Sequence, residues 1–340
     1  MAPAAPARTL PVSAAIAGRP DALTFQRPEL DTLRFFAFLM VFLFHAFDNY
    51  PAWHGGTFDR IRDIGSRGVD LFFALSAYLI TELLLRERRV LGSISLRSFY
   101  ARRVLRIWPL YYSFLLFAFF VVPHFRWQEH FPWKARLLYL AFLGSWRGLL
   151  RDSVNSVAMI LWSVSVEEQF YLSWPFLVRA SRRYHAPVCI GLLMFAVAYR
   201  TAHQGTHIVG SAADFATFAR LDGIAAGALL AVVLDGRIPM LSARGGWMLL
   251  LAGAFAMAGH MISGRASIFA NTVVAGGCIM ILVAVLSLGF RNRFLEKLGR
   301  ISYGLYVFHC SRSVPWCPII QAAGWHGSHG PFSLFSRQLR

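Results

Sequence analysis

The segment DTLRFFAFLMVFLFHAFDNY, residues 31–50, is long and apolar enough to cross a lipid bilayer. A spanning helix needs about 20 mostly apolar residues, and ten apolar residues in a row separate Arg34 from His45. Similar segments follow along the chain, which predicts an all-α polytopic membrane protein. We expect about nine spans, at 31–50, 69–85, 107–123, 157–178, 186–201, 218–235, 246–262, 268–289 and 301–321.

The composition of the 340-residue chain supports insertion into a membrane. Hydrophobic residues make up 56% of it and charged residues 15%, against about 45–50% and about 25% in soluble domains. A soluble protein of this composition could not cover its surface with polar groups. The net charge of +17 would suggest nucleic-acid binding in a soluble chain, but here we interpret it as a signal of topology and expect no nucleic-acid partner.

The distribution of basic residues predicts the orientation. With the N-terminus in the cytoplasm, the inner loops 86–106, 179–185, 236–245 and 290–300 carry sixteen Lys and Arg, and the outer loops carry nine. This bias favours a cytoplasmic N-terminus. The segment 136–150 is shorter and contains two arginines, so we expect it to be interfacial or re-entrant.

The two ends of the chain differ in character from the apolar part. Residues 1–26 are rich in Ala, Pro and Arg and are expected to form a disordered cytoplasmic tail. The transmembrane domain is expected at 27–321, followed by an irregular tail at 322–340 that is rich in Gly and looks truncated or frame-shifted. The four cysteines form no CxxC pair, and we expect no disulfide framework and no metal site.

Ionisable side chains within the expected spans are candidates for function. Such a group costs about 2.5–3.5 kcal/mol at the bilayer centre on insertion scales. Measured from the cytoplasmic ends of their spans at about 1.5 Å per residue, several polar groups reach a common depth of about 13–16 Å. They are His45, the pair Glu167 and Glu168, His309, and the hydroxyl of Ser76.

Each of these residues also has a structural interpretation. Arg34 could be a topogenic charge and His45 a core histidine bonded to a neighbouring helix. Arg220 and Asp222, nearer the outer face together with Asp70, could form a structural ion pair. Adjacent glutamates are harder to explain structurally. They point about 100° apart on a helix, so we expect them to have different partners.

A second group is the basic inner loop after the second expected span. Arg102, Arg103 and Arg106 lie at helical spacing in it. Guanidinium forks suit phosphates, and coenzyme A carries several. The alternative is a positive-inside signal that also contacts anionic membrane lipid.

These motifs, taken in order, resemble the acyltransferase family 3 membrane proteins, which O-acylate cell-surface carbohydrates. The resemblance extends from about Glu29 to His309. Its motifs are Arg34-x10-His45; Gly68-Val-Asp-Leu-Phe-Phe-Ala-Leu-Ser76; Phe99-Tyr-Ala-Arg102-Arg103-x2-Arg106-Ile-x-Pro109-x-Tyr111; Trp162-Ser-Val-Ser-Val-Glu167-Glu168-Gln-Phe-Tyr171; Arg220-x-Asp222; and Gly299-Arg-Ile-Ser302-Tyr303-x-x-Tyr306-x-x-His309. The family usually has ten helices and Ser-Gly where this chain has Ser76-Ala77.

The resemblance implies a membrane O-acyltransferase of the bacterial inner membrane, with acyl-CoA, commonly acetyl-CoA, as donor and no permanently bound cofactor. The acceptor is expected to be a carbohydrate or a lipid-linked glycan. We expect His45 to act as catalytic base or covalent relay, with Glu167 or Glu168 orienting a histidine and His309 in the same site. The donor is expected at Arg34, Arg102, Arg103 and Arg106, and the acceptor at Asp70, Ser76, Tyr171, Arg220 and Asp222.

Two alternatives remain open from the sequence. Acids and histidines within the membrane are also typical of proton-coupled transporters, although we find none of the inverted repeats that many transporters show. The irregular tail leaves an inactive truncated homologue as the other alternative. The sequence identifies neither the acyl group nor the acceptor.

Overall fold

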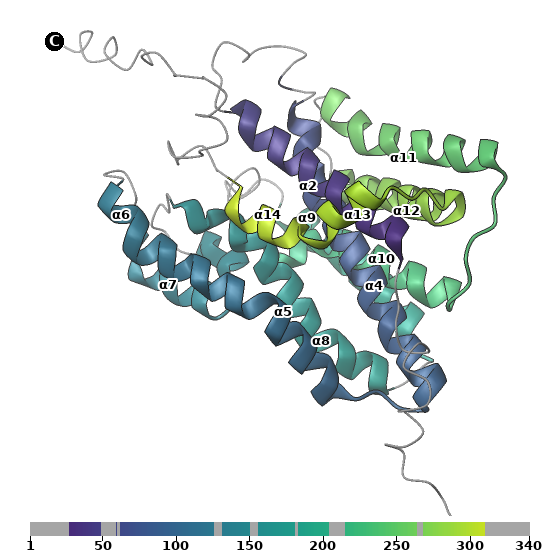
Figure 1. Cartoon of the computed structure of the whole chain (residues 1–340), viewed down its shortest axis with the longest axis horizontal. Helices are drawn as coiled ribbons and strands as arrows, with labels where there is room; N and C mark the ends of the chain where they lie inside the picture. The colour runs from purple at the N-terminus through teal and green to yellow at the C-terminus, as the bar shows by residue number, and fades with distance from the viewer. Residues whose placement is uncertain are drawn as a thin grey trace, which may run out of the picture.

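The computed structural model describes residues 27–48, 59, 62–125, 131–149, 156–180, 183–203, 215–263 and 268–309, and every element within them is helical (Figure 1). The all-α prediction is therefore confirmed for this part of the chain. The two expected tails, 1–26 and 322–340, and the second half of the expected span 301–321 lie outside the described residues.

The long helices overlap eight of the nine expected spans, although the third begins at Leu96 and not at residue 107, so that most of the expected inner loop 86–106 is helical. They are α2 (Pro28–Asp48), α4 (Gly68–Leu91), α5 (Leu96–Leu116), α8 (Trp162–Ala180), α9 (His185–Ala202), α10 (Leu221–Leu234), α11 (Ala243–Ser263) and α12 (Ala270–Leu288). Within the described residues, six helical stretches are long and apolar enough to cross a membrane, namely 28–47, 62–91, 96–124, 185–202, 217–234 and 270–288. Helices α8 and α11, with 19 and 21 residues, reach about 28–32 Å at 1.5 Å per residue, which is also the thickness of a bilayer core.

Short helical elements connect these long helices. They are η3 (Gly65–Arg67), η4 (Phe117–Val121), α6 (Val122–Phe125), α7 (Trp133–Leu140), η5 (Gly144–Leu149), η6 (Val157–Leu161), η8 (Thr217–Arg220), α13 (Arg293–Arg300) and α14 (Ser302–Phe308). Helix α5 continues directly through η4 into α6. Helices α13 and α14 follow one another and pack against α2.

The segment 136–150 does not cross the membrane as a helix. Helix α7 has eight residues and is about 12 Å long, after which the chain turns at Phe142, whose φ is 56°. The ring of Phe142 lies among the rings of Trp108, Tyr111 and Tyr112, at centroid distances of 5.5, 4.5 and 5.7 Å. This packing holds a backbone conformation that is uncommon for a residue with a Cβ atom.

One glutamine of α8 fixes the turn to the helix bundle. The amide nitrogen of Gln169 donates to the carbonyl oxygen of Phe142 at 2.8 Å and to Ser145 Oγ at 3.1 Å. Its amide oxygen accepts from Trp146 Nε1 at 3.2 Å and from Thr217 Oγ1 at 2.7 Å. Because each amide atom has two partners, the segment after α7 is held at a fixed height beside α8.

Glycine allows the closest helix contacts in the core. A Cβ atom on Gly227 of α10 would overlap the backbone carbonyl of Ala74 on α4, and one on Gly299 of α13 would overlap the carbonyl of Asp31 on α2. Helix α13 therefore lies directly on the first turn of α2 (Figure 1). This contact places the start of α14 beside α2.

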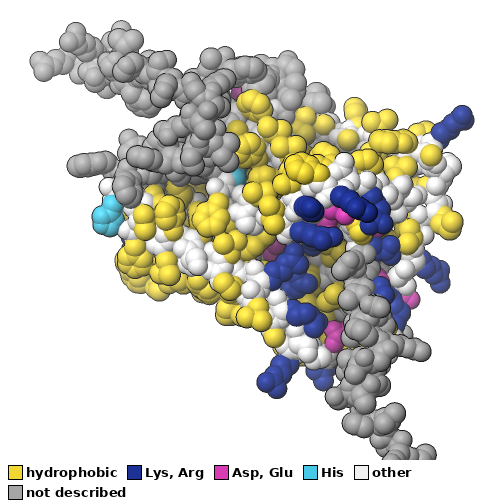
Figure 2. All heavy atoms as spheres, in the orientation of Figure 1, with side chains coloured by type: hydrophobic (Ala, Val, Ile, Leu, Met, Phe, Trp, Pro, Cys, Tyr) yellow, Lys and Arg dark blue, Asp and Glu magenta, His cyan; other side chains and the backbone are white. Residues whose placement is uncertain are grey.

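The surface agrees with a membrane protein. Lys and Arg side chains gather over α13 and over the adjoining ends of α4 and α5, while hydrophobic side chains cover much of the rest of the same face (Figure 2). Within the basic area the side chains of Arg102, Arg291 and Arg300 are more than half exposed. Exposed large hydrophobic residues such as Leu116, Phe255 and Met248 are typical of a lipid-facing surface.

Candidate active site

Two cavities lie next to each other between the helices. The first, which we call the arginine cavity, has a volume of about 80 Å³, and the second, the histidine cavity, has a volume of about 410 Å³. Val69 and Tyr306 line both cavities. The first takes its name from Arg34, Arg103 and Arg106, and the second from His45.

A pair of histidines joins the first and last described helices. His45, near the end of α2, lies with its Nδ1 3.1 Å from Nε2 of His309, which directly follows α14. The two ring centroids are 4.8 Å apart, and His309 is only 7% exposed. The structure thus brings together two candidate residues that lie 264 positions apart in the sequence.

Backbone carbonyls fix the tautomers of this pair. Nδ1 of His309 lies 2.5 Å from the carbonyl oxygen of Tyr306, and because a carbonyl oxygen only accepts, this nitrogen carries the hydrogen. In the neutral ring Nε2 of His309 is then an acceptor, so the hydrogen between the rings belongs to Nδ1 of His45. That nitrogen also lies 2.9 Å from the carbonyl oxygen of Val41, which again requires a donor. The lone pair of neutral His45 is therefore on Nε2, which makes Nε2 the basic atom of the pair.

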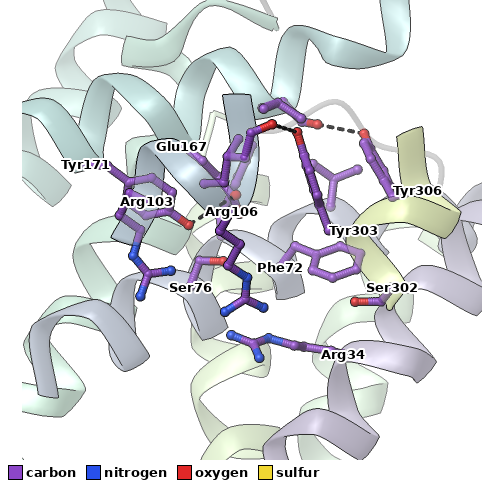
Figure 3. A pocket seen from close by; sticks show the side chains of 15 residues that line it. Arg34, Phe72, Ser76, Arg103, Arg106, Glu167, Tyr171, Ser302, Tyr303 and Tyr306 are labelled. Carbon is purple, nitrogen blue, oxygen red and sulfur yellow. Dashed lines mark hydrogen bonds between the residues drawn. The ribbon is translucent and has the colours of Figure 1, made fainter. Parts of the chain in front are cut away.

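The arginine cavity gathers like charges from two helices. Arg34 of α2 and Arg106 of α5 extend their guanidinium groups to the same side of the cavity, with Arg103 beside them (Figure 3). All three side chains line this one cavity. Arg34 is bonded to Asp31 at 2.9 Å, which leaves an excess of positive charge that an anion would offset.

Arg103 is held by aromatic rings and keeps bonding capacity. Its guanidinium carbon lies 5.8 Å from the ring centroids of both Phe99 and Tyr171, a cation–π distance. Its Nε is buried and has no hydrogen-bond partner among the described residues. Arg102, in contrast, does not line the cavity. Its side chain is 53% exposed and lies 3.6 Å from Glu87, so the structure separates it from the other three predicted donor residues.

The two adjacent glutamates have different partners, as their angular separation predicts. Glu167 lines the arginine cavity and accepts a hydrogen bond from the Tyr171 hydroxyl at 3.2 Å. Glu168 is only 2% exposed and accepts from Trp108 Nε1 at 3.1 Å. Ser76, expected beside them, lines the arginine cavity as well.

This arrangement corrects the expectation of one catalytic cavity containing both histidines and a glutamate. Glu167 and His45 line different cavities. Within the described residues, His309 and the carbonyl of Val41 are bonded to His45, where the sequence predicts a carboxylate. The position of a residue along a helix axis does not say toward which neighbouring helix its side chain turns.

Tyr306 lies, with Val69, at the boundary between the two cavities. Its hydroxyl forms a hydrogen bond of 2.6 Å with Ser163 Oγ and donates to the carbonyl oxygen of Ile160 at 3.1 Å. Those residues belong to the region where η6 continues into α8. The ring of Tyr306 is therefore fixed at the boundary, next to His309, at a centroid distance of 5.2 Å.

The expected acceptor residues Asp70, Arg220 and Asp222 take part in ion pairs, and Asp70 pairs with Arg67 at 3.4 Å as well as with Arg220. Arg220 lines the histidine cavity and pairs with Asp70 at 3.2 Å. Asp222 is fully buried and binds Arg200 through two hydrogen bonds of 2.5 and 3.1 Å. The alternative of an Arg220–Asp222 pair is therefore wrong. Two residues apart near the start of a helix, these side chains face different neighbours.

Arg147 is a site residue that we did not predict. It lies on η5, lines the histidine cavity, and is only 9% exposed. The sequence does hold a signal for it, because Arg147 stands in a segment that is otherwise apolar and too short to span. We interpreted that charge as a mark of an interfacial segment and did not expect it to reach a cavity.

The chain was compared with known proteins. It matches the model of a family described as "Acyltransferase domain" over residues 27–335. It is 34% identical over 156 residues to "Putative peptidoglycan O-acetyltransferase YrhL" of Bacillus subtilis (strain 168), a match that covers 44% of this chain and 23% of that protein. It is 25% identical over 315 residues to "Peptidoglycan O-acetyltransferase OatA" of Listeria monocytogenes serovar 1/2a, covering 83% of this chain and 48% of that protein.

The chain thus spans about a quarter to a half of the length of these curated relatives. A Staphylococcus aureus (strain COL) protein, "Putative O-acetyltransferase SACOL0978", is 29% identical over 225 residues, with 60% of this chain and 34% of that protein covered. No solved structure matches the chain.

Proposed function

We propose that this chain, which belongs to the acyltransferase-domain family, is an O-acetyltransferase of the bacterial inner membrane that acetylates a hydroxyl group of a carbohydrate. The single observation that carries the proposal is the hydrogen bond between His309 and His45, since it makes Nε2 of His45 a base within a cavity. Acyl transfer to a hydroxyl group needs such a base.

In the proposed reaction Nε2 of His45 takes the proton of the acceptor hydroxyl. The hydroxyl oxygen attacks the thioester carbonyl carbon, a C–O bond forms, and the C–S bond to coenzyme A breaks. The proton on His45 then passes to the leaving thiolate, so the neutral histidine is restored. His309 stabilises the transient imidazolium by accepting its Nδ1 hydrogen.

We assign the donor to the arginine cavity. Acyl-CoA presents several phosphate charges, and the guanidinium groups of Arg34, Arg103 and Arg106 supply the fork geometry that binds phosphate oxygens. A cavity of about 80 Å³ holds only part of so large a donor. The phosphates therefore stay at these three guanidinium groups, and the acylated arm reaches toward Tyr306.

We assign the acceptor to the histidine cavity. Its volume of about 410 Å³ lies in the range of about 300–1,000 Å³ that small-molecule sites occupy. The relatives named as peptidoglycan O-acetyltransferases favour a carbohydrate acceptor, and they favour acyl transfer over proton-coupled transport. With the basic surface in the cytoplasm, the donor would arrive from the cytoplasmic side and the acceptor from the other side.

Release of free thiol from acetyl-CoA tests the proposal. The purified full chain in lipid nanodiscs should release coenzyme A faster when a peptidoglycan-derived disaccharide is added, and the disaccharide should gain one acetyl ester per thiol. His45→Ala should lower this rate by about 10²–10⁴-fold, the usual contribution of a general base.

His124→Ala is the matched control, because His124 is an exposed histidine of α6 that lines neither cavity. It should transfer acetyl groups at the wild-type rate. Equal rates in the wild type and the His45→Ala variant would exclude His45 as base or relay. A wild type that releases no thiol with any carbohydrate would contradict the proposed activity.

A further inference from the structure

We propose that the histidine cavity contains an anion-binding site formed by Arg147, and that the acceptor carries a carboxylate or phosphate group beside the hydroxyl that is acylated. The inference rests on the proposed function in one respect, namely that the molecule bound in this cavity is the acceptor of the acyl group. The binding site itself rests only on the geometry of the cavity.

The first observation is the burial of Arg147 without a full set of partners. The residue is 9% exposed, and its Nη1 is buried with no hydrogen-bond partner among the described residues. A buried guanidinium nitrogen that lacks an acceptor costs free energy. A ligand oxygen in the adjoining cavity would remove that cost.

The second observation is the charge of the cavity. Among the described residues that line it, Arg147 and Arg220 are cationic and none is acidic. Arg220 shares the carboxylate of Asp70 with Arg67, at 3.2 and 3.4 Å, whereas no ion pair to Arg147 is found in the described part of the chain. Arg147 therefore contributes a positive charge to the cavity that no described carboxylate pairs with.

The third observation is how Arg147 is held. Its guanidinium carbon lies 4.5 Å from the ring centroid of Phe215, which also lines the cavity. The aromatic ring fixes the orientation of the guanidinium group and leaves its N–H groups free to donate in the guanidinium plane. Carboxylates and phosphates accept hydrogen bonds in this geometry.

Arg136 shows what a purely structural arginine looks like in the same segment. Its guanidinium carbon also lies over an aromatic ring, that of Phe119 at 5.5 Å, and its Nε donates to the carbonyl oxygen of Phe131 at 3.0 Å. It does not line the histidine cavity. Arg147 differs from it in two ways, its buried unpartnered nitrogen and its place on the cavity that holds His45.

Ligand binding without any donor tests the inference. The full chain in nanodiscs would be titrated with methyl β-D-glucuronide and with the uncharged methyl β-D-glucoside, and tryptophan fluorescence would report binding because Trp162 lines the cavity. A second pair of titrations, with glucose 6-phosphate and with glucose, would test a phosphate group in the same way. We expect the wild type to bind at least one anionic sugar about 10–100-fold more tightly than its neutral counterpart, as one charged hydrogen bond would give.

Arg147→Gln should reduce that preference to less than about twofold, while Arg136→Gln should keep it. If Arg147→Gln does not purify as a folded protein, Arg147→Lys is the second variant, and it should keep a preference for the anion that is weaker than that of the wild type because an ammonium lacks the fork. A wild type without preference for either anion, or an Arg147→Gln variant that keeps it, would overturn the inference. An Arg147→Lys variant with no weaker preference would overturn it as well.

The outcomes separate this inference from the proposed function. Sugar binding needs no acetyl-CoA, so a protein that transfers no acetyl group can still show the preference for an anion. A protein that acetylates neutral and anionic sugars equally well would keep the proposed function and lose the inference.

Discussion

Nε2 of His309 accepts a hydrogen bond from Nδ1 of His45 across 3.1 Å, and this bond, together with that to the carbonyl oxygen of Val41, decides which nitrogen of His45 is basic. Nε2 of His309 is an acceptor because Nδ1 of the same ring donates its hydrogen to the carbonyl oxygen of Tyr306. A short helix near the end of the described chain therefore controls the chemistry of a residue on the first helix.

The first prediction concerns this tautomer. His309→Ala removes one of the two acceptors of the Nδ1 hydrogen of His45 and the side chain that stabilises its imidazolium form. We therefore expect kcat to fall by about 10²–10⁴-fold, in the range known for bases that lose their orienting partner. Binding of acetyl-CoA should stay within about twofold of the wild type, since His309 does not line the arginine cavity. Transfer kinetics and calorimetric binding would measure the two effects. A variant that loses donor binding and rate together would indicate a structural role for His309.

The second prediction separates the arginines. Arg103→Ala or Arg106→Ala should weaken acetyl-CoA binding by about 1.5–3 kcal/mol for each charged hydrogen bond lost. Lysine at either position should restore only part of it, because an ammonium keeps the charge and lacks the fork. Arg102→Ala is the matched control, since Arg102 is largely exposed and outside the cavity. Isothermal titration would measure the acetyl-CoA affinity of each variant. An equal loss of affinity in the Arg102 variant would indicate that the donor responds to the general positive charge of the surface and not to the cavity arginines.

The sequence predicts most of this fold, and the reason is physical. Long apolar segments have few alternatives to spanning helices, so α2, α4, α5, α9, α10 and α12 lie where hydropathy places them. The close packing of α13 on α2 was not predicted. It depends on Gly299 approaching Asp31, a contact between residues far apart in the sequence.

The sequence predicts which residues lie near the two cavities better than it predicts which of them contact one another. The depth of His45 and His309 along their helices follows from residue counting, and the two rings do meet. The partition by Tyr306 could not be predicted, because it depends on hydrogen bonds to Ser163 and Ile160 of a different element. The same limit explains why Arg220 was not assigned to Asp70 on another helix.

The third prediction concerns topology. Single cysteines that replace the exposed Arg97 and Arg293 should react with an impermeant thiol reagent only after the cytoplasmic side is opened, because the basic surface is expected inside. Thr201→Cys, at the far end of α9, should react in intact cells. The remaining cysteines would be replaced by serine beforehand. Labelling of position 97 or 293 in intact cells would show that the basic surface faces outward, opposite to the predicted orientation.

The fourth prediction concerns the buried ion pair of Arg200 and Asp222. Arg200→Met leaves the fully buried Asp222 carboxylate without its cation, and we expect a loss of about 3–5 kcal/mol in the free energy of unfolding. The double variant Arg200→Met, Asp222→Leu should recover much of that loss, because no unpaired charge remains. Denaturation in detergent would measure both. Arg220→Met is the control. Its loss of stability should not be recovered by Asp222→Leu, since Arg220 pairs with Asp70.

The last prediction concerns the boundary between the cavities. Tyr306 lines both of them and is held by Ser163 and Ile160, so Tyr306→Ala should join the two spaces and admit water to the thioester. We expect more coenzyme A to be released than acetyl ester to be formed, whereas the wild type should give a ratio near one.

Tyr306→Phe separates the ring from its hydroxyl in this last test. It keeps the ring at the boundary and removes two hydrogen bonds, each with a net contribution of about 0.5–1.5 kcal/mol. Its thermal stability should therefore fall while its ratio of thiol to ester stays near one. An alanine variant with an unchanged ratio would mean that the ring does not keep water from the thioester, and donor and acceptor would then have to meet without passing Tyr306. A phenylalanine variant with a raised ratio would instead assign the barrier to the hydroxyl and its two bonds, because the ring alone would have failed to hold the cavities apart.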